Sequence, residues 1–121
     1  MKKFLKYWLP VIVWAGIIFT LSSIPNLKSG LDQDFTLRKI AHILEYAILT
    51  YLLIRAFHSL NFQFGKILIP AIIGFVYALS DEFHQTFIFG RKGRFEDVVI
   101  DSIGILLAGL LWYYITRKYE D

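Results

Sequence analysis

Apolar residues are grouped in four long runs, separated by short stretches rich in glycine, proline and charged residues. The runs cover approximately residues 4–24, 38–57, 66–87 and 97–115. A helix rises about 1.5 Å per residue, so each run is long enough to cross a hydrocarbon core of roughly 30 Å. No run alternates with a period of two, which argues against strands. The pattern predicts an all-α fold, with four transmembrane helices in an up-and-down bundle, in a single domain over residues 1–121.

Carboxylates and histidines inside the runs are confined to one end of the second, third and fourth. The second run begins with them, the third ends with them, and the fourth begins with them. Up-and-down threading therefore places all three polar ends on the same side of the membrane. A charge at the centre of a membrane helix costs about 2.5–3.5 kcal/mol on insertion scales, so such residues are rare and usually functional. We expect a polar cluster at one end of the bundle.

Composition agrees with a membrane protein. Of the 121 residues, 56% are hydrophobic, and the mean hydropathy is +0.52, which is more apolar surface than a soluble fold of this length could bury. The chain contains no cysteine, which excludes disulfides and thiolate chemistry. Its net charge of +3 is spread over termini and loops, so we expect no nucleic-acid partner.

The orientation depends on the flanking Lys and Arg residues. Seven of them lie on one side and six on the other, so the count alone hardly decides. Lys2, Lys3 and Lys6 precede the first helix, which usually dominates topology. No small-residue cleavage pattern follows this run, so it is interpreted as an uncleaved helix rather than a signal peptide. We expect a multi-pass protein of the bacterial cell membrane, with both termini in the cytoplasm and the polar end at the outer face.

The second run carries a polar stripe. Lys39, His42 and Tyr46 recur at steps of three and four and share one helical face, with Glu45 three residues after His42. Lys39 is long enough to snorkel outward, whereas Glu45 needs a partner, a water-filled cavity or a proton. A structural ion pair of Glu45 with Lys39 or His42 is the alternative.

The third run ends in a second group of polar residues. Asp81, His84 and Gln85 share a face of this helix, as do Glu82 and Gln85. Because Asp81 and Glu82 are adjacent, we expect one to face the site and the other to face the headgroups or a loop. A solvated helix end is the alternative for both.

The fourth run carries a stripe of acidic and small residues: Asp97, Asp101, Gly104 and Ala108. Gly104 and Ala108 form a small-xxx-small surface that favours close helix contact, so this face should point into the bundle. Asp97 also suits the helix dipole without any further role. Arg91 and Arg94 precede this run between glycines and suit a phosphate, although they could equally neutralise the carboxylates.

Several motifs, taken in order, resemble the VanZ-like family of small bacterial membrane proteins. They are Leu21-Ser22-Ser23-Ile24-Pro25, Lys39-x-x-His42-x-x-Glu45-Tyr46, Ser80-Asp81-Glu82-x-x-Gln85-x-Phe87, and then Arg91, Asp97 and Gly104. Two positions depart from the family pattern: Arg38, where an acidic residue is common, and Asp101, where asparagine is common. The resemblance implies a multi-pass membrane protein. The family takes its name from a protein linked to teicoplanin resistance, but the resemblance does not imply that this chain confers resistance.

The expected function is to bind or process a phosphate-bearing lipid, or a lipid-linked cell-envelope component, at the outer leaflet. Histidine titrates near neutral pH and suits acid–base chemistry. The candidate catalytic residues are His42, Glu45, Asp81 and Asp101. The candidate substrate-binding residues are Lys39, Glu82, His84, Gln85, Arg91, Arg94 and Asp97.

Other functions remain open. The polar network could serve only to lock the helices of a structural or accessory protein. A proton-coupled transporter fits less well, because the carboxylates are not distributed through the bilayer. No run shows a metal-ligand signature such as HExxH, so no metal and no cofactor are assigned, although His with Asp and Glu would suit hard or borderline cations.

Overall fold

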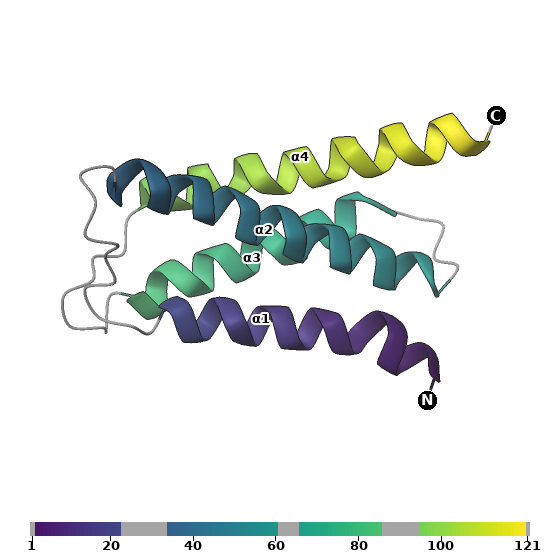
Figure 1. Cartoon of the computed structure of the whole chain (residues 1–121), viewed down its shortest axis with the longest axis horizontal. Helices are drawn as coiled ribbons and strands as arrows, with labels where there is room; N and C mark the ends of the chain where they lie inside the picture. The colour runs from purple at the N-terminus through teal and green to yellow at the C-terminus, as the bar shows by residue number, and fades with distance from the viewer. Residues whose placement is uncertain (1, 23–33, 61–65, 86–94, 121) are drawn as a thin grey trace.

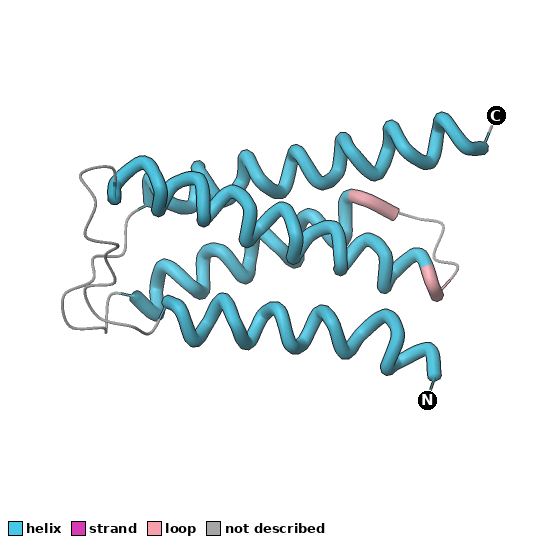
Figure 2. The backbone as a smooth tube through the Cα atoms, in the orientation of Figure 1, coloured by secondary structure: helices cyan, strands magenta, loops and turns pink. Residues whose placement is uncertain are grey.

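The computed structural model describes residues 2–22, 34–60, 66–85 and 95–120, and the side chains of 2–21, 39–60, 66–84 and 98–116. These residues form a π-helical segment η1 (Phe4–Trp8) and the helices α1 (Leu9–Ser22), α2 (Asp34–His58), α3 (Leu68–Gln85) and α4 (Phe95–Glu120). The helices run alternately in opposite directions, and both chain ends lie at the same end of the bundle (Figure 1). The predicted all-α, up-and-down fold is confirmed, and Figure 2 shows only helix and short loop pieces in the described part of the chain.

The predicted boundaries differ from the observed ones by a few residues. The second helix begins at Asp34, before the predicted start at 38. The third begins at Leu68, after the predicted start at 66, and its predicted end at 87 lies outside the described residues. The fourth continues to Glu120, past the predicted end at 115. Hydropathy defines the part of a helix that lies in lipid, whereas the helix itself continues into the polar flanks.

The first predicted helix is divided into η1 and α1. Pro10 has no backbone N–H, so it cannot form the hydrogen bond to the carbonyl of Lys6 four residues earlier. The chain takes wider π turns at Phe4–Trp8 instead.

Among the described residues, three helices are long and apolar enough to cross a membrane, through Phe4–Leu21, Lys39–His58 and Val98–Thr116. The remaining helix, α3, is apolar from Leu68 to Leu79 and then ends in the polar run 80–85. Large apolar side chains are exposed on every α-helix, which suits a lipid environment and not water. The protein is therefore a membrane protein.

The centre of the bundle is the contact between α2 and α4. Gly104 is buried, and a Cβ at this position would collide with the backbone carbonyl of Ile43 and lie 3.0 Å from the amide of Ala47. Ala108 is 3% exposed, one turn further along α4. The prediction that this stripe of small residues faces the bundle is confirmed. Because the two backbones are in contact here, the distance between α4 and α2 is set by this close packing.

The first helix is attached by hydrogen bonds to backbone carbonyls. Trp14 Nε1–H of α1 donates to the carbonyl of Glu45 in α2, at 2.9 Å. Tyr77 Oη–H of α3 donates to the carbonyl of Ala15 in α1, at 2.6 Å. Lipid tails are as apolar as the helix surfaces, so the hydrophobic effect does not drive helices together in a membrane. Hydrogen bonds between helices, such as these two, contribute to their association instead.

Candidate functional site

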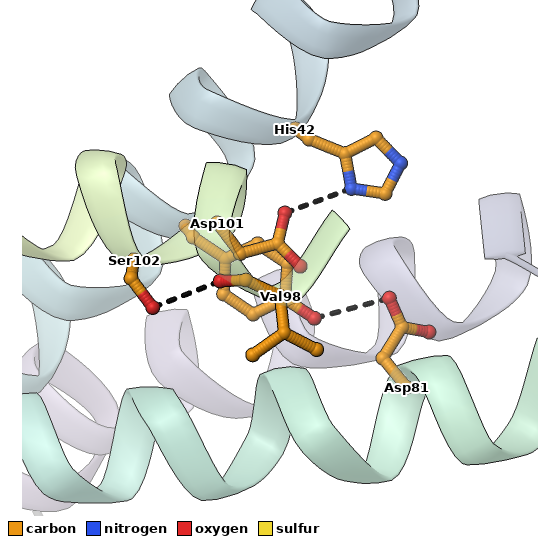
Figure 3. A network of polar contacts seen from close by, with 6 residues as sticks. His42, Asp81, Val98, Asp101 and Ser102 are labelled. Atoms are coloured by element: carbon orange, nitrogen blue, oxygen red, sulfur yellow. Dashed lines mark hydrogen bonds and ion pairs between the residues drawn. The ribbon is translucent and has the colours of Figure 1, made fainter. Parts of the chain in front are cut away.

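A direct contact between His42 of α2 and Asp101 of α4 lies at the centre of the polar end (Figure 3). His42 Nδ1 lies 2.9 Å from Asp101 Oδ1. The Asp101 side chain is 0% exposed and that of His42 is 17% exposed. With Nδ1 protonated, the ring donates to the carboxylate, which fixes its orientation and leaves Nε2 for another partner. This arrangement suits acid–base chemistry.

A second hydrogen bond lies one turn further along α2. Tyr46 Oη–H donates to Asp81 Oδ2 of α3, at 3.0 Å. Tyr46 is fully buried and Asp81 is 5% exposed. The other carboxylate oxygen, Asp81 Oδ1, is buried without a hydrogen-bond partner. The polar stripe of α2 therefore contacts α4 through His42 and α3 through Tyr46.

The expectation that only one of Asp81 and Glu82 points inward is wrong. Both are buried, at 5% and 6% exposure. Adjacent helical residues point about 100° apart, and α3 packs against both α2 and α4. The inward sector of α3 is therefore wide enough for two neighbouring side chains.

Glu82 joins the histidine and aspartate in a compact group. One ligand atom each from His42, Glu82 and Asp101 lies within 4.8 Å of the other two. The three residues belong to α2, α3 and α4, so the group forms only when these helices pack together. The sequence assigned Glu82 to substrate binding, and the structure places it beside the pair that suits acid–base chemistry.

The predicted residues Lys39, Glu45 and His84 lie at the same end of the bundle but outside the group formed by His42, Glu82 and Asp101. Lys39 is half-buried, one turn before His42 on α2. Glu45 is half-buried and lies outside the compact group. The ring of His84 stacks on Phe19 of α1, with centroids 4.4 Å apart. His84 therefore contacts the first helix, whereas His42 contacts the fourth.

Four predicted site residues have no described side chain. Gln85 is the last residue of α3, and Asp97 lies in the first turn of α4, so both backbones are at the polar end. Arg91 and Arg94 lie outside the described residues. Their proposed contact with a phosphate stays a prediction.

Thr50 was missed by the sequence interpretation. It is fully buried in α2, and its Oγ1 has no hydrogen-bond partner. A Cβ at Gly74 of α3 would lie 2.9 Å from this oxygen. Thr50 follows Tyr46 by four residues, so extending the polar stripe of α2 by one more step would have found it.

An apolar groove of about 310 Å³ follows the α2–α4 contact below the polar end. Its lining residues are Ala47, Ile48, Tyr51, Leu52, Leu107, Ala108 and Leu111. Ile48, Leu107 and Leu111 are exposed, so the groove faces the lipid. Ala47 follows His42 by five residues, which places the start of the groove about 7.5 Å from the histidine along α2.

Comparison with known proteins agrees with the motifs. The model of the VanZ/LLP1 family matches residues 4–117. The uncharacterized membrane protein YwnJ of Bacillus subtilis (strain 168) is 34% identical over 119 residues, covering 92% of this chain and 79% of the relative. No solved structure matches the chain.

Proposed function

The chain belongs to the VanZ/LLP1 family of proteins, and we propose that it binds a phosphate-bearing lipid, with the headgroup at the polar end of its bundle. The observation that carries the proposal is the His42–Asp101 contact, a partly buried acid–base pair at the polar end of the same two helices that line an apolar groove. Apolar residues would hold an acyl chain, and a few convergent polar groups would select the headgroup. The lipid could belong to the membrane itself or be a lipid-linked envelope precursor.

The spacing between groove and histidine suits one lipid molecule. The groove begins about 7.5 Å from His42 along α2, and Ala108 follows Asp101 by two turns on α4. An acyl chain lying against Ile48 and Leu107 would leave the polar part of the same molecule at the depth of the His42–Asp101 pair.

The chemistry at the headgroup follows from the residue types. Asp101 would hold the His42 ring through Nδ1, and Nε2 would accept or donate a proton at the headgroup. Lys39, Arg91 and Arg94 would hold the phosphate, with the guanidinium groups offering two parallel hydrogen bonds. The polar end would face the outer leaflet.

A purely structural role is the second candidate, and the Tyr46–Asp81 bond favours it. This bond is buried and joins two helices, so it contributes to packing whatever the site binds. Thermal melts therefore accompany each binding measurement below.

The test is lipid binding by native mass spectrometry of the purified protein in detergent. We expect retention of phosphatidic acid and phosphatidylglycerol, and not of diacylglycerol with the same acyl chains. His42→Asn and Arg91→Lys should lower phospholipid retention while the protein melts near the wild-type temperature. The control is His58→Asn, at the opposite end of α2, where the ring packs on Trp112.

The groove has its own matched pair of variants. Ile48→Trp fills the groove from an exposed position, and we expect weaker retention of long-chain lipids. Ile72→Trp makes the same change at an exposed position of α3 outside the groove and should leave retention unchanged. If every substitution that removes lipid also unfolds the protein, the structural role stands and the lipid proposal fails.

A further inference from the structure

We propose that His42, Glu82 and Asp101 bind one divalent transition-metal ion, of the Mn²⁺ or Zn²⁺ class, at the polar end of the bundle. The proposal goes beyond lipid binding and does not depend on it, because the three ligands come from the protein alone. No short spacing along the chain connects the three ligands, because each lies on a different helix, so they form no metal-binding sequence motif.

The geometry is close to that of a bound ion. The three ligand atoms lie within 4.8 Å of one another, and the His42 and Asp101 atoms are already 2.9 Å apart. Ligands of a tetrahedral zinc ion sit about 2.0–2.2 Å from the metal, which places them roughly 3.4 Å from each other. A change in the Glu82 side-chain torsions that brings its carboxylate closer to the His42–Asp101 pair would supply the third ligand of such a site. The ion would take the place of the hydrogen bond between His42 and Asp101.

The burial of the two carboxylate ligands also suits a cation. Four carboxylates with described side chains lie at this end: Glu45, Asp81, Glu82 and Asp101. Glu82 and Asp101 are more than nine-tenths buried, where an ionised carboxylate is costly unless a positive charge compensates it. A divalent ion compensates two carboxylates at once.

The donor set narrows the choice of ion. Mg²⁺ and Ca²⁺ prefer shells made entirely of oxygen, and Mg²⁺ keeps several waters. One imidazole nitrogen with two carboxylates suits Zn²⁺ and the borderline ions that accept both nitrogen and oxygen. With three protein ligands the ion would retain an open position, which could be taken by water or by an anionic oxygen such as that of a phosphate.

Asp81 and Tyr46 would form the surroundings of the ion. Tyr46 Oη–H donates to one oxygen of Asp81, and the other oxygen, Asp81 Oδ1, is buried without a hydrogen-bond partner. Asp81 is adjacent to Glu82 on α3 and is itself buried. A metal-bound water could donate to this oxygen, and such outer groups tune metal affinity about 10–100-fold.

The first experiment uses the wild-type protein without added lipid. The protein is purified in detergent, stripped with a chelator and dialysed against Mn²⁺, Zn²⁺, Mg²⁺ or Ca²⁺ in turn. We expect one Mn²⁺ or Zn²⁺ per chain by elemental mass spectrometry, and a melting temperature that rises with the concentration of that ion. Saturable binding of neither Mn²⁺ nor Zn²⁺, or equal binding of all four ions, would overturn the proposal.

The second experiment assigns the ligands. Glu82→Gln and Asp101→Asn should each weaken Mn²⁺ or Zn²⁺ binding by at least about a hundredfold, more than an outer residue would. Asp81→Asn should weaken it less, and His58→Gln, at the far end of α2, should leave it unchanged. If Asp101→Asn fails to fold, Glu82→Gln decides. Wild-type affinity in folded Glu82→Gln would contradict the site.

The metal and lipid proposals can fail separately. Metal binding without lipid retention supports the site and rejects the lipid. Lipid retention that persists in the chelator-stripped protein, with no ion bound after dialysis, supports the lipid and rejects the site.

Discussion

The two halves of the α2–α4 contact are held by different forces. In the middle of the bundle, the backbone of Gly104 rests on Ile43 and Ala47, and no polar side chain is involved. One turn away, the same two helices meet through the His42–Asp101 contact, where the aspartate has no exposure at all. Packing of small residues alone joins helices well in lipid.

The difference indicates which half is required by the fold. Close backbone contact along Gly104 and Ala108 already fixes the separation and the register of the two helices. Buried ionisable groups add a desolvation penalty that apolar residues would avoid, so they contribute little net stability. The binding role proposed above would account for their presence in the polar half.

Among the substitutions that test this comparison, Gly104→Ala should have the largest effect on stability. The added methyl group collides with the Ile43 carbonyl, which is backbone and cannot rotate away. We expect the free energy of unfolding in detergent to fall by about 3 kcal/mol, the upper range for overpacked cores. The control is Gly16→Ala in α1, where no atom lies within 4 Å of the new methyl. Equal melting of the two variants would show that packing does not fix α4 on α2.

Tyr46→Phe should have the next largest effect on stability. The change removes the donor to Asp81 and leaves a buried carboxylate oxygen without its partner. We expect a loss of about 1–3 kcal/mol, measured by thermal or denaturant unfolding. Tyr114→Phe, on a ring that is 64% exposed, provides the matched control with an expected change near zero. A neutral result at Tyr46 would mean that Asp81 finds another donor.

Thr50→Val should act in the opposite direction. The Thr50 hydroxyl is buried without a hydrogen-bond partner, and valine replaces it by a methyl group of similar size. We expect a gain of about 1 kcal/mol, because the desolvation penalty of the hydroxyl is removed. Thr20→Val, where the exposed hydroxyl bonds the carbonyl of Gly16, should give no gain. A destabilised Thr50→Val protein would show that this hydroxyl has a partner in the membrane.

Single cysteines should leave stability unchanged and reveal which side the polar end faces. The chain has no cysteine, so each introduced thiol is unique. Lys66→Cys, exposed before α3 at the end of the bundle that holds both termini, should react only after permeabilisation (Figure 1). Lys28→Cys, which lies outside the described residues between α1 and α2, should react from outside intact cells. The reverse pattern would place the polar end in the cytoplasm.

The sequence predicted the helices because hydropathy over about twenty residues depends only on composition. It also predicted the inward face of α4, since the spacing of Asp101, Gly104 and Ala108 defines one stripe whatever the neighbours are. The convergence of the polar ends followed from the alternation of helix direction. Helix positions and helix faces are thus local properties of the sequence, and the convergence requires only the number of times the chain crosses the membrane.

The partners within the polar end were decided by the tertiary structure alone. The spacing on α2 could not tell whether His42 pairs with Glu45 on its own helix or with Asp101, 59 residues away. Nor could the order Asp81-Glu82 reveal that both would be buried, because that depends on α3 lying against two helices at once. Helix periodicity gives the direction of each side chain about its own axis, whereas the rotation and separation of the helices are set by close packing at Gly104, and these determine which polar atoms meet.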